Sequence, residues 1–502
     1  MTFINTSYLL AVSPFILFAA LLLWKKMPLL KVSLIILFII FVFQLFYWQI
    51  QPVFILSSFV KGFLIALDIF FIIFGAIFFL EVLKGLRIIE GITTYLGTFS
   101  KDHRVQVILL AWFFENFIEG TAGFGTPAII VAPLLIGLGI APINAVIISL
   151  LGNSASVAFG AAGTPSRIGF AGLDTSSVPV YTAAFNMVGL LVPVFMMWML
   201  SLQQKNKRKF FLEILPFALW SGIVFVIPSF IVSFWGEEFP SIIGSVIGIM
   251  LILTTTKLGF LIPKNVEHLG QSEKEEVKTN KFKVLFPYAL LILLLFVGKF
   301  TLGSIPITFP WGLKYSFNLF NPGFMFLIAL IPVIFIWREN NIKIFKMSKH
   351  ALKRTVEPFL IIVAMSTMVQ LMINSGNNLT GLPSSLEIIA KGFEVKALPV
   401  LAPFVGMFGA AITGSATISN IMFGSLLNTA SRVMNMNSSV ILALELVGAA
   451  AGNMIALADV IVAEAAVGLK NQTRNVLKGV IIPCIIYVSI VGVIGFIVSN
   501  YF

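Results

Sequence analysis

Residues 113–165 read FFENFIEGTAGFGTPAIIVAPLLIGLGIAPINAVIISLLGNSASVAFGAAGTP, and this stretch decides the fold. It is apolar enough to lie in a lipid bilayer, yet it contains Glu115, Glu119 and two clusters of glycine with small polar residues. Non-helical backbone at membrane depth persists only where protein or a water-filled cavity satisfies its N–H and C=O groups. A weaker version of the pattern recurs at residues 413–459. Two interrupted apolar segments at matching places in two halves indicate a transporter's binding site.

The composition excludes a soluble protein. Of the 502 residues, 59% are hydrophobic and only 11% are charged, whereas soluble chains average about 25% charged residues. Long apolar runs such as residues 63–79 favour helices, because barrel strands would alternate. We therefore predict an all-α polytopic membrane protein. Its formal charge of +12 lies in short loops between apolar spans, which favours a lipid bilayer and argues against nucleic acid as the partner.

Few residues suggest chemistry of other kinds. Cys484 is the only cysteine and lies in an apolar segment, so no disulfide framework or zinc site is expected. The three histidines lie in loops, and the common hydrolase, metalloprotease and nucleotide-binding patterns are absent from the sequence. We expect no enzyme activity, no metal and no cofactor. Residues 8–24 lack a basic flank and a small-residue cleavage site, so they are interpreted as a first span and not as a cleaved signal.

The distribution of lysine and arginine predicts the topology. Basic residues cluster in alternate loops, which places those loops in the cytoplasm. This alternation holds only if residues 105–138 form a re-entrant hairpin from the cytoplasm and residues 396–430 form one from outside. The prediction is about twelve crossings plus two re-entrant hairpins, with both termini outside and the protein in the plasma membrane. The expected spans lie near residues 7–24, 29–48, 53–83, 143–163, 178–200, 213–235, 241–258, 284–300, 322–337, 356–374, 438–456 and 476–499.

The two halves are predicted to be inverted repeats. Similar glycine-rich breaks follow similar amphipathic pieces in both halves, and the span at 53–83 runs inward where its counterpart at 356–374 runs outward. Such repeats permit alternating access around a midplane site. We expect an N-terminal transmembrane helix at 1–27 and a first repeat at 28–200, which contains the first hairpin and a broken helix at 143–163. Linking helices and a cytoplasmic loop follow at 201–321. The second repeat, at 322–502, contains the second hairpin and a broken helix at 438–456.

The tip of the first hairpin is expected to bind an anion. Gly123 and Gly125 permit positive φ and a close approach of backbone to a ligand. Thr126 is expected to be the N-cap of the returning helix, with proline in its first position. A helix N-terminus at the bilayer midplane suits a carboxylate. The alternative is that the glycines only let helices pack closely.

Acidic residues near both breaks are candidates for ion coupling. An ionised Glu119 would be costly at this depth, so it is expected to be protonated or paired for part of a cycle, as a proton carrier is. Glu115 lies one helical turn earlier. In the second half, Glu445 and Asp459 could bind a cation or a proton, or pair with a basic neighbour. A static hydrogen-bonded acid is the alternative for Glu119 and Glu115.

Neutral polar residues complete the predicted site. Asn153 and Ser154 interrupt the first broken helix, and they could contact a carboxylate and a hydroxyl of the substrate. Serine and threonine often only bond back to helix carbonyls, which is the alternative for all such positions. Arg167 could pair with the substrate or with Asp174, or could anchor a loop. The second tip contributes the candidates Ser415, Thr417, Ser419 and Asn420.

With these residues in place, the chain resembles the L-lactate permease family. The resemblance is strongest at FIEGTAGFGTP (117–127) and VAFGA (157–161), and it continues at TGS (413–415), FGSL (423–426) and AAVGL (465–469). The chain departs from the family at Ala416, Glu445 and Asn453, where the family usually has asparagine, a neutral polar residue and lysine. The resemblance implies uptake of L-lactate or glycolate with protons across the plasma membrane. The departures suggest a different 2-hydroxy acid or coupling ion as an alternative.

The leading hypothesis is therefore a proton-coupled symporter of a small organic anion. Sodium coupling and another anion remain alternatives, and a channel or an intramembrane enzyme fits the duplicated breaks less well. The paired hairpins also resemble those of dicarboxylate carriers that move a transport domain against a dimeric scaffold. That analogy concerns the fold alone, and it leaves a homodimer, and an elevator or a rocking motion, as open alternatives.

Overall fold

The computed structural model describes residues 2–25, 27–97, 99–123, 125–267, 281–337, 341–392 and 396–501. Most of these residues are helical and very few are in strands, which confirms the predicted all-α class. The helices of the first half are α1 Thr2–Leu23, α2 Leu29–Phe46, α3 Pro52–Gly85, α4 Ile88–Gly97, α5 His103–Ile108, α6 Glu115–Thr121, α7 Thr126–Gly137, α8 Pro142–Gly152, α9 Gly160–Gly169, α10 Val178–Phe185, α11 Val192–Ser201, α12 Lys207–Ser233 and α13 Pro240–Lys257.

The second half has the same character. Its helices are α14 Lys281–Thr301, α15 Pro322–Trp337, α16 Asn341–Asn374, α17 Ser385–Gly392, α18 Leu398–Thr413, α19 Ala416–Val433, α20 Ser438–Gly452, α21 Leu457–Ala466 and α22 Thr473–Tyr501. Four short irregular helices are the π-helix η1 Leu109–Phe114 and the 3₁₀ helices η2 Val157–Phe159, η3 Asn186–Leu191 and η4 Asn453–Ile455.

One antiparallel hairpin lies between α14 and α15. Strands β1 Ser304–Thr308 and β2 Lys314–Asn318 pair in register from Ser304 opposite Asn318 to Thr308 opposite Lys314. Both segments alternate apolar and polar residues, which is the pattern of a strand. Their shortness and the neighbouring long apolar helices hid that signal.

The helices suffice for a multi-pass membrane protein. Among the described residues, nine helical segments are long and apolar enough to cross a bilayer, and α8 with α9 makes a tenth if this bent pair is one span. The shorter apolar helices α14 and α15 would bring the number to the predicted twelve. The exact number of crossings and the re-entrant character of the hairpins stay predictions.

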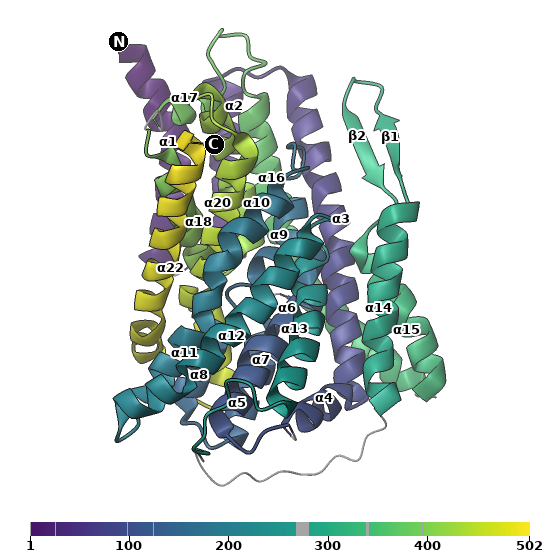
Figure 1. Ribbon diagram of the computed structural model, residues 1–502. Helices are drawn as coiled ribbons and strands as arrows, with labels where there is room; N and C mark the ends of the chain where they lie inside the picture. Colours follow the sequence, from purple (N-terminus) through teal and green to yellow (C-terminus); the bar gives the residue numbers. More distant parts are fainter. Residues whose placement is uncertain are drawn as a thin grey trace.

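The ends of the bundle differ in charge. Both termini and the β1–β2 hairpin lie at one end, and α4, α5 and the loop before α12 lie at the other (Figure 1). The second end carries basic residues in several loops, among them Lys101 and Lys205 to Lys209. By the positive-inside rule we predict that this end faces the cytoplasm and that the end with the strands faces outward.

The long helices α3 and α16 pack side by side, and α3 runs along most of the height of the molecule (Figure 1). Glycines allow their close approach. A Cβ added at Gly62 would lie 2.4 Å from the hydroxyl of Thr367 on α16, and one added at Gly75 would lie 2.4 Å from the carbonyl oxygen of Gly323 on α15. Small residues at contacts are typical of helices packed in a membrane, where closeness of the backbones replaces the hydrophobic driving force.

The interrupted segments have the same order of elements in both halves. In the first half, α6 ends and α7 returns, then α8 is followed by the 3₁₀ turn η2 and by α9 at an angle of 55°. In the second half, α18 ends at a glycine and α19 returns, then α20 is followed by the 3₁₀ turn η4 and by α21. The predicted breaks at Gly152 and Gly452 therefore both exist as 3₁₀ interruptions. The inverted relation of the two halves remains a prediction.

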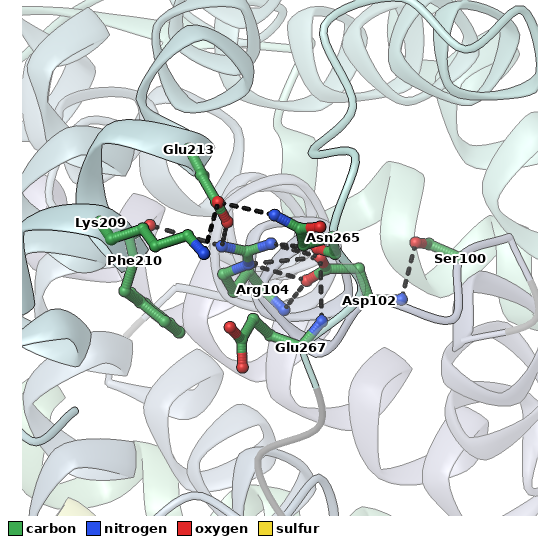
Figure 2. Close-up of polar contacts among 8 residues, drawn as sticks. All are labelled: Ser100, Asp102, Arg104, Lys209, Phe210, Glu213, Asn265 and Glu267. Atoms are coloured by element: carbon green, nitrogen blue, oxygen red, sulfur yellow. Dashed lines mark hydrogen bonds and ion pairs between the residues drawn. The ribbon is translucent and has the colours of Figure 1, made fainter. Parts of the chain in front are cut away.

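A buried ion-pair cluster fixes the cytoplasmic base of the first hairpin (Figure 2). The Arg104 guanidinium lies 2.8 Å from the Asp102 carboxylate and 3.3 Å from that of Glu213 on α12. It also donates to the carbonyl oxygens of Asn265 at 2.7 Å and Phe210 at 3.4 Å. Asp102 in turn caps α5 by accepting from the Arg104 backbone N–H. Because Arg104 and Asp102 are buried and the guanidinium donors are used, the cluster locks α5, α12 and the loop before α14 together.

Candidate functional site

A cavity of about 230 Å³ lies where the two interrupted segments meet. Given that a water takes about 30 Å³ of liquid, the cavity has room for a small organic anion. Its polar lining comes from both halves, and the two tips and two breaks contribute together. The lining residues are Leu29, Glu119, Gly123, Gly125, Val157, Gly160, Ala161, Thr164, Pro165, Pro358, Ile361, Ile362, Thr413, Gly414, Ser415, Ala416, Thr417, Ile418, Asn453 and Asp459.

Several helices begin at this cavity. Helix α7 starts after Gly125, α19 starts after its N-cap Ser415, and α21 carries Asp459 in its first turn. The regular turn of α9 begins there too, after the kink that ends at Gly163. Helix N-termini present backbone N–H groups without intrahelical partners, and partial positive charge. Among the described residues, no lysine or arginine lines the cavity, so these N-termini are its source of positive potential.

The helix starts in the first half are built from one repeated tripeptide, Gly-Thr-Pro, at 125–127 and 163–165. Both glycines have positive φ, 69° at Gly125 and 80° at Gly163. The hydroxyls of Thr126 and Thr164 each donate to the carbonyl oxygen three residues earlier, at 2.7 Å. The proline then fits the first turn because its missing N–H has no intrahelical role there.

The first tip differs in one detail from the prediction. Gly125 is the N-cap of α7, and Thr126 is the first helical residue. The left-handed backbone that the tip requires falls on the glycine, which adopts it without steric cost. The Thr126 hydroxyl is therefore used inside the turn, and the residue is buried outside the cavity wall.

The Glu119 side chain extends to the cavity beside Gly160, where the missing side chain of the glycine leaves room for it. A Cβ added at Gly160 would lie 2.3 Å from Glu119 Oε1, so the carboxyl occupies the space that a side chain would take. Glu119 is 3% exposed, and its Oε2 has no hydrogen-bond partner among the described residues. The side chain of Asn153 lies within hydrogen-bonding range of this carboxyl. The structure thus brings two predicted residues together, with Glu119 facing the cavity and Asn153 behind it.

Asp459 brings a second carboxyl to the same cavity from the other half. A Cβ added at Gly125 would lie 2.9 Å from Asp459 Oδ1, so the glycine of the first tip also makes room for this acid. The carboxyls of Asp459 and Glu119 interact electrostatically. Two acids and several helix N-termini therefore share one small space.

Glu115 lies behind Glu119 and outside the cavity lining. It is fully buried and comes directly after the π-helix η1, whose wider turns shift the side chains beyond it. The Ser149 hydroxyl donates to Glu115 Oε1 at 2.6 Å, and Oε2 has no hydrogen-bond partner within the described ranges. Gly152 gives α8 its close approach to this region, because an added Cβ there would lie 1.7 Å from the carbonyl oxygen of Ala111.

The second tip places only some of its predicted residues in the cavity. Ser415 and Thr417 line it, and the Ser415 hydroxyl also caps α19 by accepting from the Ile418 N–H at 3.3 Å. Ser419 instead donates to the Gly406 carbonyl oxygen at 3.1 Å, and Asn420 donates to the Pro165 carbonyl oxygen at 2.8 Å. These two side chains join α19 to α18 and to the kink of α9.

Two further predicted residues lie away from the cavity. Ser154 donates to the Leu151 carbonyl oxygen at 2.7 Å, which is the back-bonded arrangement of a helix serine. Glu445 is fully buried in α20, and neither of its carboxyl oxygens has a hydrogen-bond partner in the part of the chain that the structure describes. Gly424 of α19 lies next to Glu445. A Cβ added at Gly424 would lie 3.6 Å from Glu445 Oε2.

Some lining residues were not predicted as site residues. Thr164 and Gly160 had a usable signal, because they repeat the Gly-Thr-Pro pattern and its glycine spacing. Asn453 was expected at the end of the glycine-rich break of the second half and as a departure from a family pattern, but not as a site residue. Pro358 and Ile361 of α16 carried no signal, since an apolar wall residue looks like any other membrane residue. No group of three or more His, Cys, Asp or Glu side chains that could hold a metal ion occurs among the described residues.

Comparison with known proteins gives a consistent result. The model of a family described as L-lactate permease matches residues 7–308 and 305–502. A putative L-lactate permease of Haemophilus influenzae is 28% identical over 467 residues, which cover 84% of this chain and 85% of that protein. The glycolate permease GlcA of Escherichia coli is 27% identical over 493 residues, 86% of this chain and 85% of its own. The L-lactate permease of Salmonella typhi is 26% identical over 478 residues, with 88% and 86% coverage.

Proposed function

The chain belongs to the L-lactate permease family, and on this premise we propose that it imports L-lactate or a related 2-hydroxy monocarboxylate such as glycolate with protons. The single observation that carries the proposal is the cavity at which α7, α19 and α21 begin and which Glu119 and Asp459 also line. The protein is a permease by family and multi-pass by its apolar helices, which supports a place in the cell membrane. The substrate, its coupling ion and the mechanism are the proposal.

The carboxylate of the substrate would bind at the helix starts. Backbone N–H groups at the first turns of α7 and α19 supply donors, and the Ser415 and Thr417 hydroxyls supply further neutral partners for the carboxylate and the 2-hydroxyl. Broken helices whose N-termini point at an anion are a recurrent design of membrane carriers. A site of about 230 Å³ suits a small acid better than a bulky one.

The acids in the same cavity support proton coupling. An anion beside ionised Glu119 and Asp459 would be repelled, because like charges in a site of low dielectric constant interact strongly. Protonation of one or both carboxyls removes that repulsion, so proton and anion each favour the binding of the other. The orphan oxygen of Glu119 is where such a proton would be exchanged. Glu115, held by Ser149, is the next acid toward the cytoplasmic base of the hairpin.

Alternating access would occur around this cavity, with the two predicted inverted repeats exchanging roles. The lining extends to Leu29, the first residue of α2. Sodium in place of the proton, and a homodimer as the working unit, remain alternatives to this proposal.

The proposal is tested by uptake into proteoliposomes with an imposed proton gradient. Gradient-driven accumulation of radiolabelled L-lactate, blocked by glycolate and insensitive to succinate, is the expected result. Replacing sodium with potassium on both sides separates the two coupling ions. Absence of L-lactate flux with correctly folded protein would overturn the substrate, and flux that requires sodium would overturn the proton.

Glu119→Gln isolates the role of the proton. Since the amide keeps the shape of the carboxyl but cannot carry a proton, proton-driven accumulation should be lost, while exchange of L-lactate between equal concentrations should remain. The matched control is Glu387→Gln, because Glu387 is an exposed acid of α17 that does not line the cavity. Retained accumulation in Glu119→Gln would remove this residue from the coupling mechanism.

A further inference from the structure

A second and larger cavity, of about 710 Å³, is lined by residues of α3 and of the β1–β2 hairpin, and the hairpin lies at the end predicted to face outward (Figure 1). We call it the outer vestibule. Four basic residues and two acidic ones line it: Lys61, Arg167, Lys299, Lys314, Asp68 and Glu237. Exposed residues of the strands, such as Lys314 and Ser316, form its rim. The charged residues of the central cavity are acids only, so the two cavities differ in the sign of their charge.

Half of the basic residues in the vestibule are already paired. The Glu238 carboxylate, buried behind the wall, lies 3.0 Å from the Arg167 guanidinium and 2.9 Å from the Lys299 ammonium. Both cations also lie over the Phe320 ring, at 5.1 Å and 5.7 Å from its centroid. This arrangement answers the question that the sequence left open for Arg167. It anchors the wall through Glu238 and does not pair with Asp174.

The acid on the opposite wall is occupied too. Asp68 of α3 accepts a hydrogen bond from the Tyr315 hydroxyl of β2, and its backbone carbonyl oxygen accepts from the Asn321 amide at 3.0 Å. These bonds hold the strand hairpin against α3. Asp68 is therefore engaged by a neutral donor, and in the described part of the chain neither it nor Glu237 forms an ion pair with Lys61 or Lys314.

Two lysines remain without partners. Within the described part of the chain, the side chains of Lys61 and Lys314 have no hydrogen bond or ion pair, although both residues line the vestibule. Lys61 is half-buried on α3, and Gly172 stands in front of it, with an added Cβ only 3.5 Å from the Lys61 ammonium. A side chain there would cover the ammonium, whereas glycine leaves it open. An unpaired ammonium in a partly enclosed wall is a ready partner for an anion.

We propose that the outer vestibule is an anion-recruiting site, in which Lys61 with Lys314 draws a small carboxylate from the outer solution toward the central cavity. This inference rests on the proposed function, since it assumes that the transported species is an anion. The two cavities share one wall, because α9 contributes Thr164 and Pro165 to the central cavity and Arg167 to the vestibule. A carboxylate held at Lys61 is therefore separated from the helix starts by a single segment.

The test is the kinetics of L-lactate uptake into cells, where substrate meets the outer face alone. Lys61→Gln should raise KM about fivefold, a factor of the size set by one unit charge near another in water, and should leave the maximal rate nearly unchanged. Raising the ionic strength should weaken uptake at low substrate in the unmodified protein and have less effect in the variant. Lys61→Arg should restore most of the lost affinity, which a merely structural lysine would not predict.

Two further lysine variants test whether the effect belongs to the vestibule. Lys314→Gln changes an exposed strand residue that cannot disturb the helical core, and it should give a smaller rise of KM in the same direction. Lys396→Gln removes an exposed lysine outside the vestibule lining and is the matched control, with unchanged KM. Unaltered KM and salt dependence in Lys61→Gln and Lys314→Gln, with normal L-lactate uptake, would overturn the vestibule alone. Absence of L-lactate uptake in the unmodified protein would overturn the proposed function instead.

Discussion

The two hairpin tips solve the same geometric problem with different chemistry. Each reverses the chain at a glycine in the left-handed region, Gly125 with φ 69° and Gly414 with φ 72°, and each is followed by a helix that begins at the central cavity. The first tip brings the acid Glu119 and uses its own threonine inside the turn. The second brings the hydroxyl of Ser415 and no acid. The acid on its side comes later, from Asp459.

This difference suggests a division of labour between the halves. A tip with a buried, partly unpartnered carboxyl suits proton exchange, and a tip with hydroxyls and free helix N–H groups suits a carboxylate. In a symmetric site both tips would place a carboxylate beside the substrate, and each carboxylate would repel the substrate anion. The asymmetry can be broken, or sharpened, by changing one half at a time.

The largest expected effect comes from closing the space that Glu119 occupies. The backbone of Gly160 has φ −63° and ψ 151°, which alanine adopts easily, so Gly160→Ala acts through its new methyl group alone. That group would lie 2.3 Å from Glu119 Oε1 and must push the carboxyl away. We expect proton-driven uptake to fall at least tenfold, equivalent to about 1.4 kcal/mol, with little change in thermal stability.

Gly137→Ala is the matched control for this variant. Gly137 is exposed in the last turn of α7, and an added Cβ meets nothing within 4 Å. Uptake should therefore equal that of the unmodified protein. If Gly160→Ala transports normally, the Glu119 carboxyl does not need its present position, and the acidic tip loses its assigned role.

The second tip should show a smaller effect that falls on substrate affinity. Ser415→Ala removes both a hydroxyl that lines the cavity and the cap of α19, so we expect KM to rise several-fold and stability to fall by about 1 kcal/mol. Thr126→Ala in the first tip removes a hydroxyl that bonds only within its own turn. It should lower stability by a similar amount without raising KM. Equal changes of KM in the two variants would contradict the division between the tips.

The sequence predicted the interruptions well because their causes are local. Glycine, proline and acids inside apolar segments cannot form continuous lipid-facing helix, and the breaks at Gly152 and Gly452 lie where these residues gather. The positive-inside rule likewise uses residues that are visible one at a time. The fold class and the meeting of both tips at one site follow from such signals.

Which of the side chains point into the cavity could not be predicted, because their directions depend on irregular turns. Glu115 and Glu119 both follow the π-helix η1 and lie one turn apart on the same face of α6, yet only Glu119 is at the depth of the cavity. The irregular turn before η2 leaves Ser154 bonded to its own helix. Periodicity of an ideal helix gives the wrong face beyond such a turn. The partners of Arg167 were also out of reach, since Glu238 and Phe320 lie far away along the chain.

The smallest effects are expected at the predicted hydroxyls that lie outside the cavity. The Ser154 hydroxyl bonds to the Leu151 carbonyl oxygen and that of Ser419 to the Gly406 carbonyl oxygen, so neither is available to a substrate in this arrangement. Ser154→Ala and Ser419→Ala should each keep KM for L-lactate within about twofold and cost about 1 kcal/mol of stability, the usual net worth of one hydrogen bond.

Uptake kinetics and thermal denaturation of the two variants separate these quantities. Ser419→Ala has an additional packing test, because the hydroxyl fills space against Gly409, where an added Cβ would lie 2.3 Å from Ser419 Oγ. Gly409→Ala should therefore impair folding more than either serine variant. A large rise of KM in Ser154→Ala or Ser419→Ala would mean that the hydroxyl turns to the substrate in another state of the transport cycle. The asymmetry of the two tips would then be a property of one state alone.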